Sequence, residues 1–160
     1  ELRIAFNPVL HPDVAMGSII KHPLVAIVPP NHPLAERKSV ELSDLTGFEV
    51  ATLHPSFGTQ QILDRALIAA DVRLEALLTI NSIEMLKAFV ARGLGVSVIP
   101  LFAVAREQDD RELVAVAIDN DALRESHLAL CWRKERELGA ATEAFRAHIE
   151  RELQKFFAQD

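Results

Sequence analysis

Two predicted helices begin on residues that suit the binding of polar groups. These residues are Ser56, Gly58 and Thr59 before the first helix, and Asn81 and Ser82 before the second. Hydroxyl and amide oxygens at these positions cap helices and stabilise them by about 1 kcal/mol each. Helix N-termini with free amide N–H groups also bind small anions and polar molecules. Both interpretations, plain capping and a binding edge, stay open for each helix start.

Other residue types that carry chemistry lack a suitable pattern. Arg92-Gly93-Leu94-Gly95 follows a predicted helix and precedes a strand, which is the reverse of a dinucleotide-binding loop. The six histidines include no pair at HExxH spacing, so we predict no metal site and no cofactor. Cys131 lies in a predicted strand without a catalytic motif and is interpreted as a small buried residue.

The composition is that of a globular domain without a strongly basic surface. The chain has 160 residues, of which 49% are hydrophobic and 25% charged, and its net charge is −6. This charge does not indicate nucleic-acid binding by the chain itself. The single cysteine excludes an internal disulfide and fits a cytoplasmic protein. Apolar runs are too short to span a membrane, and we expect no membrane partner.

The hydrophobic pattern predicts an α/β fold with mostly parallel strands. We expect residues 7–22 to be irregular, Ser43 to cap a one-turn helix, and Asn81 to cap the second long helix. Gly93 is expected in the left-handed conformation that ends this helix. The expected strands are 1–6, 24–28, 49–53, 74–80, 96–99, 112–118 and 128–132, and the expected helices are 59–70, 82–92, 101–106 and 139–157.

Residues 49–99 form two consecutive strand–helix crossovers in this prediction. Both helices begin at the carboxyl end of a strand, and open α/β sheets bind ligands outside that edge. We therefore expect Ser56–Thr59 and Asn81-Ser82 to share one rim, where hydroxyls and backbone N–H groups suit a small anion or polar molecule.

Several segments in order resemble the C-terminal effector-binding domain of LysR-type transcriptional regulators. The strand and turn HPLVAIVPPNHPLA and the helix and strand SVELSDLTGFEVATL come first. The two crossovers PSFGTQQILDRALIAADV and TINSIEMLKAFVARGLGVSVIP follow, and LALCWRKERELGAATEAFRAHI resembles the last strand and helix. The resemblance covers nearly the whole chain, and its specificity lies in the order and spacing of the segments.

The resemblance implies a periplasmic-binding-protein-like fold of two lobes with an effector in the cleft between them. Residues 1–21 correspond to a first-lobe strand and crossing segment, 22–117 to the second lobe, and 118–160 to the return into the first lobe. The second lobe is then complete and the first partial. Since the chain opens within a strand and without an initiator methionine, we expect a piece of a longer protein.

The same resemblance implies the residues of an effector site and the partners of the protein. The site residues carried over are Ser56, Phe57, Gly58, Thr59, Asn81, Ser82, Pro100 and Phe102. The expected partners are an unidentified small-molecule effector and further copies of the chain, as a dimer or tetramer. DNA would be bound only through an N-terminal helix-turn-helix domain that this sequence does not contain.

Two alternatives to a regulator follow from the same residues. A solute-binding protein of a transport system has a similar two-lobed fold. An enzyme on this fold would need a titratable base at the rim, where His54 is the nearest candidate. We expect no enzymatic activity.

Overall fold

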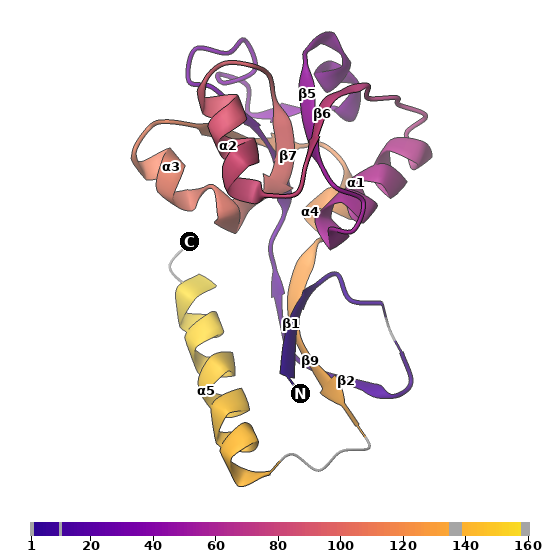
Figure 1. Ribbon diagram of the computed structural model, residues 1–160, viewed down its shortest axis with the longest axis vertical. Helices are drawn as coiled ribbons and strands as arrows, with labels where there is room; N and C mark the ends of the chain where they lie inside the picture. Colours follow the sequence, from indigo (N-terminus) through magenta and orange to yellow (C-terminus); the bar gives the residue numbers. More distant parts are fainter. Residues whose placement is uncertain (1, 10, 135–138, 158–160) are drawn as a thin grey trace. The chain divides into compact units, whose positions relative to one another are not determined.

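The chain folds into two compact units. The computed structural model describes residues 2–9, 11–134 and 139–157. Unit 1 combines the N-terminal residues up to Lys21 with those from His127 onward, and unit 2 is the continuous segment His22–Ser126 (Figure 1). The sequence places the end of the second lobe at Ala117, whereas the compact unit continues to Ser126.

Unit 1 is a three-stranded antiparallel sheet with one long helix. Its strand order is β1-β9-β2, so β9 is central. The elements are β1 Leu2–Phe6, β2 Val14–Lys21, β9 His127–Arg133 and α5 Ala140–Phe157. The predicted irregular segment 7–22 is therefore wrong over β2. Pro8 and Pro12 precede the strand, and its register shifts only between Met16 and Ile19, around Gly17.

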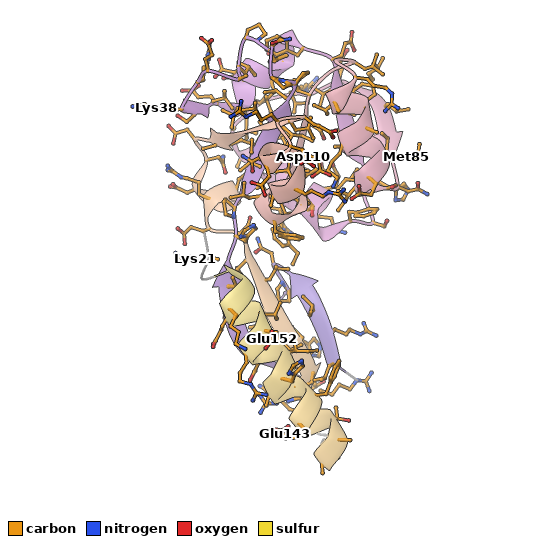
Figure 2. All side chains as sticks on the ribbon, turned by 90° about the vertical axis from the view of Figure 1, so that its left-hand side faces the viewer. Lys21, Lys38, Met85, Asp110, Glu143 and Glu152 are labelled. Carbon is orange, nitrogen blue, oxygen red and sulfur yellow. The ribbon has the colours of Figure 1, made fainter. Side chains whose placement is uncertain are left out.

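A cation–π contact connects α5 to this sheet. The guanidinium of Arg146 lies 4.9 Å from the centre of the Trp132 ring on β9, a cation–π contact. Arg146 also bonds to Glu150, with 3.0 Å between Nη1 and Oε1, and to Glu143 in the preceding turn. The α5 side chains, including Glu143 near its start and Glu152 further along, are drawn in Figure 2.

An apolar stripe of α5 stays accessible within unit 1. Phe145 is 56% exposed, and it lines an open groove of about 680 Å³ together with Ile4, Ile149 and Leu153. Burial of apolar side chains is the main source of folding free energy. These side chains of α5 are partly exposed, so they contribute only part of the free energy that full burial would give. In the sequence, Phe156 continues the helical spacing of Phe145, Ile149 and Leu153, but its side chain lies outside the described part of the chain.

Unit 2 is built on a mixed sheet. Four strands have the order β4-β8-β3-β7, and β5-β6 form a parallel pair. A parallel bridge between Val50 and Val96 joins β5 to the strand start of β7. The strands are β3 Leu24–Val28, β4 Ser39–Val40, β5 Val50–Leu53, β6 Ala76–Ile80, β7 Ser97–Pro100 and β8 Val114–Ile118.

The expectation of mostly parallel strands is wrong. The central strand β3 runs antiparallel to both β7 and β8, and all pairs of unit 1 are antiparallel as well. Parallel pairing is confined to β5, β6, the start of β7, and the short pair β4–β8. Strands joined by a crossover helix, such as β5 and β6, run parallel. The connections to β3 and β8 reverse the direction of the chain, so β3 runs antiparallel to both of its neighbours.

The helices of unit 2 follow the predicted periodicity except at their ends. They are α1 Gly58–Ala69, α2 Ile83–Ala91, α3 Ala105–Asp109 and α4 Asp121–Arg124, with 3-10 helices at Leu42–Gly47 and Leu101–Ala103. The predicted helix 101–106 is thus split in two, and α4 and β4 were not predicted.

Two predicted caps are wrong, and one helix end is confirmed. The N-cap residue of the 3-10 helix is Glu41, not Ser43. The N–H of Glu41 donates to the Asp44 carboxylate at 2.9 Å. Ser82, not Asn81, caps α2 by accepting the N–H of Met85 at 3.3 Å. Gly93 has φ +71°, the left-handed conformation expected at the end of α2.

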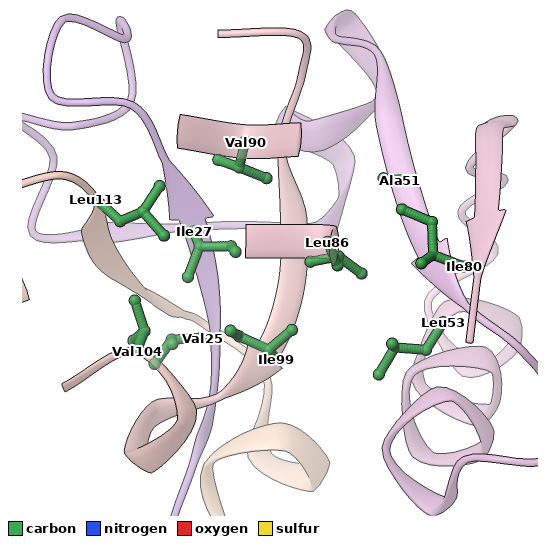
Figure 3. Close-up of a cluster of buried hydrophobic side chains, with 10 residues drawn as sticks. All are labelled: Val25, Ile27, Ala51, Leu53, Ile80, Leu86, Val90, Ile99, Val104 and Leu113. Atoms are coloured by element: carbon green, nitrogen blue, oxygen red, sulfur yellow. The ribbon is translucent and has the colours of Figure 1, made fainter. Parts of the chain in front are cut away.

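One hydrophobic cluster forms the interior of unit 2. It joins side chains from four strands, from α2 and from the α3–β8 region, as Figure 3 shows. The members are Val25, Ile27, Ala51, Leu53, Ile80, Leu86, Val90, Ile99, Val104 and Leu113. Each fully buried large side chain contributes about 1.5–3 kcal/mol relative to its exposed state. Phe57 and Leu101 pack against this cluster and connect it to the sheet edge described next.

Candidate functional site

The carboxyl ends of β5, β6 and β7 meet at one edge of unit 2. Leu53 and Ile80 are register partners, and the N–H of His54 donates to the Ile80 carbonyl at 2.8 Å. Strand β7 runs parallel to β5, so Pro100 lies at the same edge. We call this region the carboxyl edge; it comprises residues 54–59, 81–82 and 100–102. The structure thus brings together all eight site residues named from the sequence.

The N-terminus of α1 at this edge carries no side-chain cap. Phe57 is the N-cap residue and makes no capping hydrogen bond, and the first turn contains no acidic residue. The plain-capping interpretation of Ser56 and Thr59 is therefore wrong. Amide N–H groups of the first turn have no partner within a helix, and the helix dipole adds partial positive charge there. This end of α1 suits an anionic or hydrogen-bond-accepting group.

The side chains around this helix start are held by local bonds. Thr59 is only 6% exposed, whereas Ser56 and Gly58 are exposed. The Ser56 hydroxyl lies 2.9 Å from Nδ1 of His54, and the Ser56 N–H donates to the same nitrogen at 3.2 Å. Phe57 packs its ring on the hydrophobic cluster. The turn is thus anchored on its apolar side and polar on its open side.

Gln60 fixes the first turn of α1 to the end of β5. Its Oε1 accepts the N–H of Leu53 at 3.1 Å, and its Nε2 donates to Asp64 at 2.7 Å. At 6% exposure it is a buried amide whose hydrogen bonds are satisfied. Sequence reasoning missed this residue, although a glutamine on the apolar face of an amphipathic helix was a usable signal.

The second helix start behaves differently. Asn81 is exposed, and the Ser82 hydroxyl is occupied in capping α2. Glu84 adds an acidic side chain to the first turn of α2. Capping and negative charge make this helix end a poor anion site, so α1 and α2 contribute unequally to the carboxyl edge.

The turn after β7 completes the carboxyl edge and is supported by contacts with buried side chains. Pro100 is buried, and the ring of Phe102 lies 5.2 Å from that of buried His22. Lys87 on α2 donates to the Ala103 carbonyl at 3.0 Å and to Glu107 on α3 at 2.7 Å. Neither His22 nor Lys87 was singled out from the sequence, because their partners come from distant segments.

The ion pair behind this turn is nearly buried. Burial opposes the charge of Lys87, but bonds from Glu107 and Glu84 outweigh it and raise the pKa of Lys87. Burial likewise opposes the charge of Glu107, and the bond from Lys87 outweighs it, so the pKa of Glu107 is lowered. Both groups are therefore charged in the folded protein at neutral pH, and they lock α3 to α2.

The described residues offer no other reactive centre at the edge. They contain no group of three or more His, Cys, Asp or Glu side chains arranged to hold a metal ion. Cys131 lies on β9 of unit 1, where burial raises the pKa of its thiol. None of the helices in the described ranges is long and apolar enough to cross a membrane.

Comparison with known proteins identifies the family. The model of the LysR substrate binding domain matches residues 1–154. The chain therefore belongs to the LysR substrate binding domain family, as its segments predicted. Its fold is the two-lobed, periplasmic-binding-protein-like α/β fold of the regulatory domains of this family.

Its curated relatives are transcriptional regulators. The RuBisCO operon transcriptional regulator of Allochromatium vinosum is 28% identical over 86% of this chain and 45% of its own length. The regulator CbbR of Xanthobacter flavus is 30% identical over 86% of this chain and 42% of its own length. The chain thus spans about half the length of these relatives or less. They favour a regulator over the alternative of a transport-associated solute-binding protein.

Solved structures share the fold. The CcmR regulatory domain of Synechocystis PCC6803, in complex with 2-PG, has a TM-score of 0.82 at 22% identity, over 93% of this chain and 71% of that one. The effector-binding domain of QuiR, in complex with shikimate, has a TM-score of 0.80 at 20% identity, over 98% and 73% of the two chains.

Proposed function

We propose that this chain is the effector-sensing domain of a bacterial LysR-type transcriptional regulator and binds a small molecule at the carboxyl edge. The observation that carries the proposal is the uncapped, acid-free N-terminus of α1 beside Ser56 and Thr59. Ser56, Phe57, Gly58 and Thr59 form the main contact, with Pro100 and Phe102 beside it and Asn81 and Ser82 as weaker contributors. No covalent chemistry is involved, and the protein acts in the cytoplasm.

Binding is converted into regulation by a shift between two arrangements of the protein. An effector that binds one arrangement more tightly increases its population by that difference in affinity. The DNA-binding function belongs to a helix-turn-helix domain outside this chain, as the names of several relatives suggest. The net charge of −6 agrees with a sensing role that leaves DNA contact to another domain.

Self-association is a further part of this proposal. Strand β6 is paired only with β5 among the described strands, and its other edge is open. Its side chains Leu77 and Leu78 are 57% and 44% exposed. An open strand edge with exposed leucines is a surface that a second copy would cover. Leu78→Lys is expected to lower the molar mass measured by light scattering, and an unchanged mass would remove β6 from the interface.

Titration with small carboxylates tests the sensing function. Shikimate, the ligand present in the QuiR structure, and related acids are added to the protein while amide chemical shifts are recorded. We expect saturable shifts at residues 56–60, and at least tenfold weaker binding in Thr59→Ala, from loss of one hydrogen bond to a charged group. Thr142→Ala near the start of α5 is the matched control. Undiminished binding in Thr59→Ala would remove this edge from the site.

A further inference from the structure

Helix α3 is anchored in unit 2 by the residues that flank it. None of its five residues, Ala105–Asp109, is buried. The flanking residues Val104 and Leu113 are fully buried members of the hydrophobic cluster. A helix of this length is not stable in water by itself. Among its five residues, Glu107 alone is shielded, with 17% of its side chain accessible, so the position of α3 depends on the contacts of this carboxylate.

Lys87 of α2 binds this carboxylate with one of its three hydrogen-bond donors. An ammonium group carries three hydrogens and has no acceptor. Nζ of Lys87 lies 2.7 Å from Oε1 of Glu107, 3.0 Å from the Ala103 carbonyl and 2.8 Å from Oε1 of Glu84. These three acceptors use all of its hydrogens. Lys87 therefore has no hydrogen left for the second carboxylate oxygen of Glu107.

This second oxygen makes the ion pair incomplete. Oε2 of Glu107 is buried and has no hydrogen-bond partner among the described residues, whereas buried polar atoms are usually paired. The attraction within a buried ion pair offsets the loss of hydration only when the remaining lone pairs are satisfied as well. Here one charged oxygen has lost water without gaining a donor. The closed position of α3 is therefore opposed by the same carboxylate that holds it.

The end of α3 adds backbone strain to the closed position. Arg111 has φ +56°, a left-handed conformation that is unfavourable for a residue with a Cβ. The chain reversal at this residue lets the N–H groups of Glu112 and Leu113 donate to the Glu107 carbonyl at 2.8 and 3.2 Å. Release of α3 relieves this strain and returns water to the Glu107 carboxylate in the same movement.

We propose that α3 is a strap that opens locally, over residues 105–112, while the hydrophobic cluster of unit 2 stays folded. The Lys87–Glu107 pair sets how often the strap opens, because the attraction between the charges closes it and the unpaired oxygen opposes closure. Val104 and Leu113 stay buried as its two fixed ends. Since Lys87 also bonds to the Ala103 carbonyl, the strap and the turn after β7 share one cation. The inference does not rest on effector binding.

Native-state amide hydrogen exchange tests the local opening. The N–H groups of Gln108 and Asp110 bond within the strap, and that of Ala51 bonds to the Val96 carbonyl in the sheet. We expect the two strap amides to exchange about tenfold faster than Ala51 or more, relative to their intrinsic rates. Their exchange should not respond to dilute urea, because a local opening exposes little surface. Equal protection of the three amides, or an equal response to urea, overturns the proposal.

Substitution of one or both charged residues tests the role of the ion pair. Lys87→Met leaves a buried carboxylate without its cation, and exchange in the strap is expected to rise about a hundredfold. Lys87→Met combined with Glu107→Leu removes the unpaired oxygen as well, so the strap is expected to exchange about tenfold more slowly than in the wild type. Glu84→Gln, at the exposed partner of Lys87, is the control and stays within about threefold of the wild type. A double variant whose strap exchanges as fast as the wild type, or faster, overturns the proposal.

Discussion

Units 1 and 2 bury their apolar side chains to very different degrees. In unit 2, buried hydrophobic residues come from strands β3 to β8 and from α1, α2 and α4. In the described part of unit 1, the buried hydrophobic residues are Leu128, Ala129, Leu130 and Cys131, all on the central strand β9. Its helix α5 contacts the sheet through the cation–π pair of Arg146 and Trp132, and Arg146 is itself bonded to two glutamates of the same helix.

The difference shows which region is able to position a site. Unit 2 has a closed interior, in which the buried side chains of Leu53, Ile80 and Ile99 hold the ends of β5, β6 and β7. Unit 1 has one layer of helix and one sheet, with Ile4, Ile19 and Phe145 more than half exposed. A hydrogen-bonding constellation needs rigid support, and the carboxyl edge belongs to the unit that supplies it. Five substitutions measure this contrast.

The largest effect is expected for Leu86→Ala in the cluster of unit 2. Leu86 is fully buried on α2, so its truncation removes transfer free energy and leaves a cavity. The free energy of unfolding is expected to fall by about 4 kcal/mol. Amide hydrogen exchange resolves the loss by unit, and it should appear throughout unit 2. A loss below that of Phe145→Ala would contradict the contrast between the units.

Lys87→Met tests the ion pair behind the carboxyl edge. It leaves the Glu107 carboxylate buried without its cation, which is expected to destabilise the protein by about 3 kcal/mol at pH 7. The pKa of Glu107 is lowered in the folded protein, so the pair stabilises above the ordinary pKa of 4.5 and its contribution is lost as pH falls through the folded value.

The free energies of unfolding of the wild type and of Lys87→Met should therefore differ most at neutral pH and least in acid. Urea unfolding at a series of pH values measures this difference. Glu84→Gln is the control, because Glu84 is the more exposed partner of Lys87, with 79% of its side chain accessible. A destabilisation that does not depend on pH would mean that lost packing of the lysine stem, and not its charge, is responsible.

Two glycine substitutions compare the units by the same chemical change. A Cβ at Gly95 of unit 2 would collide with the Glu49 carbonyl and lie 2.9 Å from the Phe89 ring. A Cβ at Gly17 of unit 1 would meet the Glu150 carboxylate, the end of a flexible side chain, and lie 3.1 Å from the Trp132 ring. We expect Gly95→Ala to cost about 2 kcal/mol and Gly17→Ala less than about 1 kcal/mol, in thermal unfolding. The reverse order would place the tighter packing in unit 1.

The smallest effect is expected for Phe145→Ala. Because this ring is 56% exposed in the groove of unit 1, its removal should change the unfolding free energy by no more than about 0.5 kcal/mol. Calorimetry of the isolated chain provides the measurement. A loss of several kcal/mol would show that the groove is covered in solution, and that unit 1 is less open than its described residues indicate.

The sequence predicted the helix periodicity and the edge better than the sheet. Alternation between apolar runs and helical stripes located β5, α1, β6 and α2 within a few residues, because each pattern is local. Strand β2 was missed since its partner β9 lies more than a hundred residues away. The antiparallel direction of β3 was missed for the same reason, as pairing direction is a property of the connections and not of the strand.

The position of the candidate site was predicted from the sequence, but the hydrogen bonds of its side chains were not. Crossover topology alone indicates that Ser56–Thr59 and Asn81-Ser82 share an edge. It does not reveal that Ser82 is a cap whereas Ser56 is bonded to a histidine ring, because those choices depend on side-chain rotamers. Lys87 was missed because long charged side chains on helices are usually solvated, and only the fold shows that it is buried. Gln60 was missed although its place on the apolar face of α1 indicated burial.

The first and last residues of unit 2 are hydrogen-bonded to each other: the N–H of His22 donates to the carbonyl of Ser126 at 2.7 Å. A segment with adjoining ends and its own complete interior meets the geometric conditions of an inserted domain, which can be exchanged or circularly permuted with little change to its host. We therefore expect residues 22–126 to be exchangeable or circularly permutable as one continuous stretch of gene.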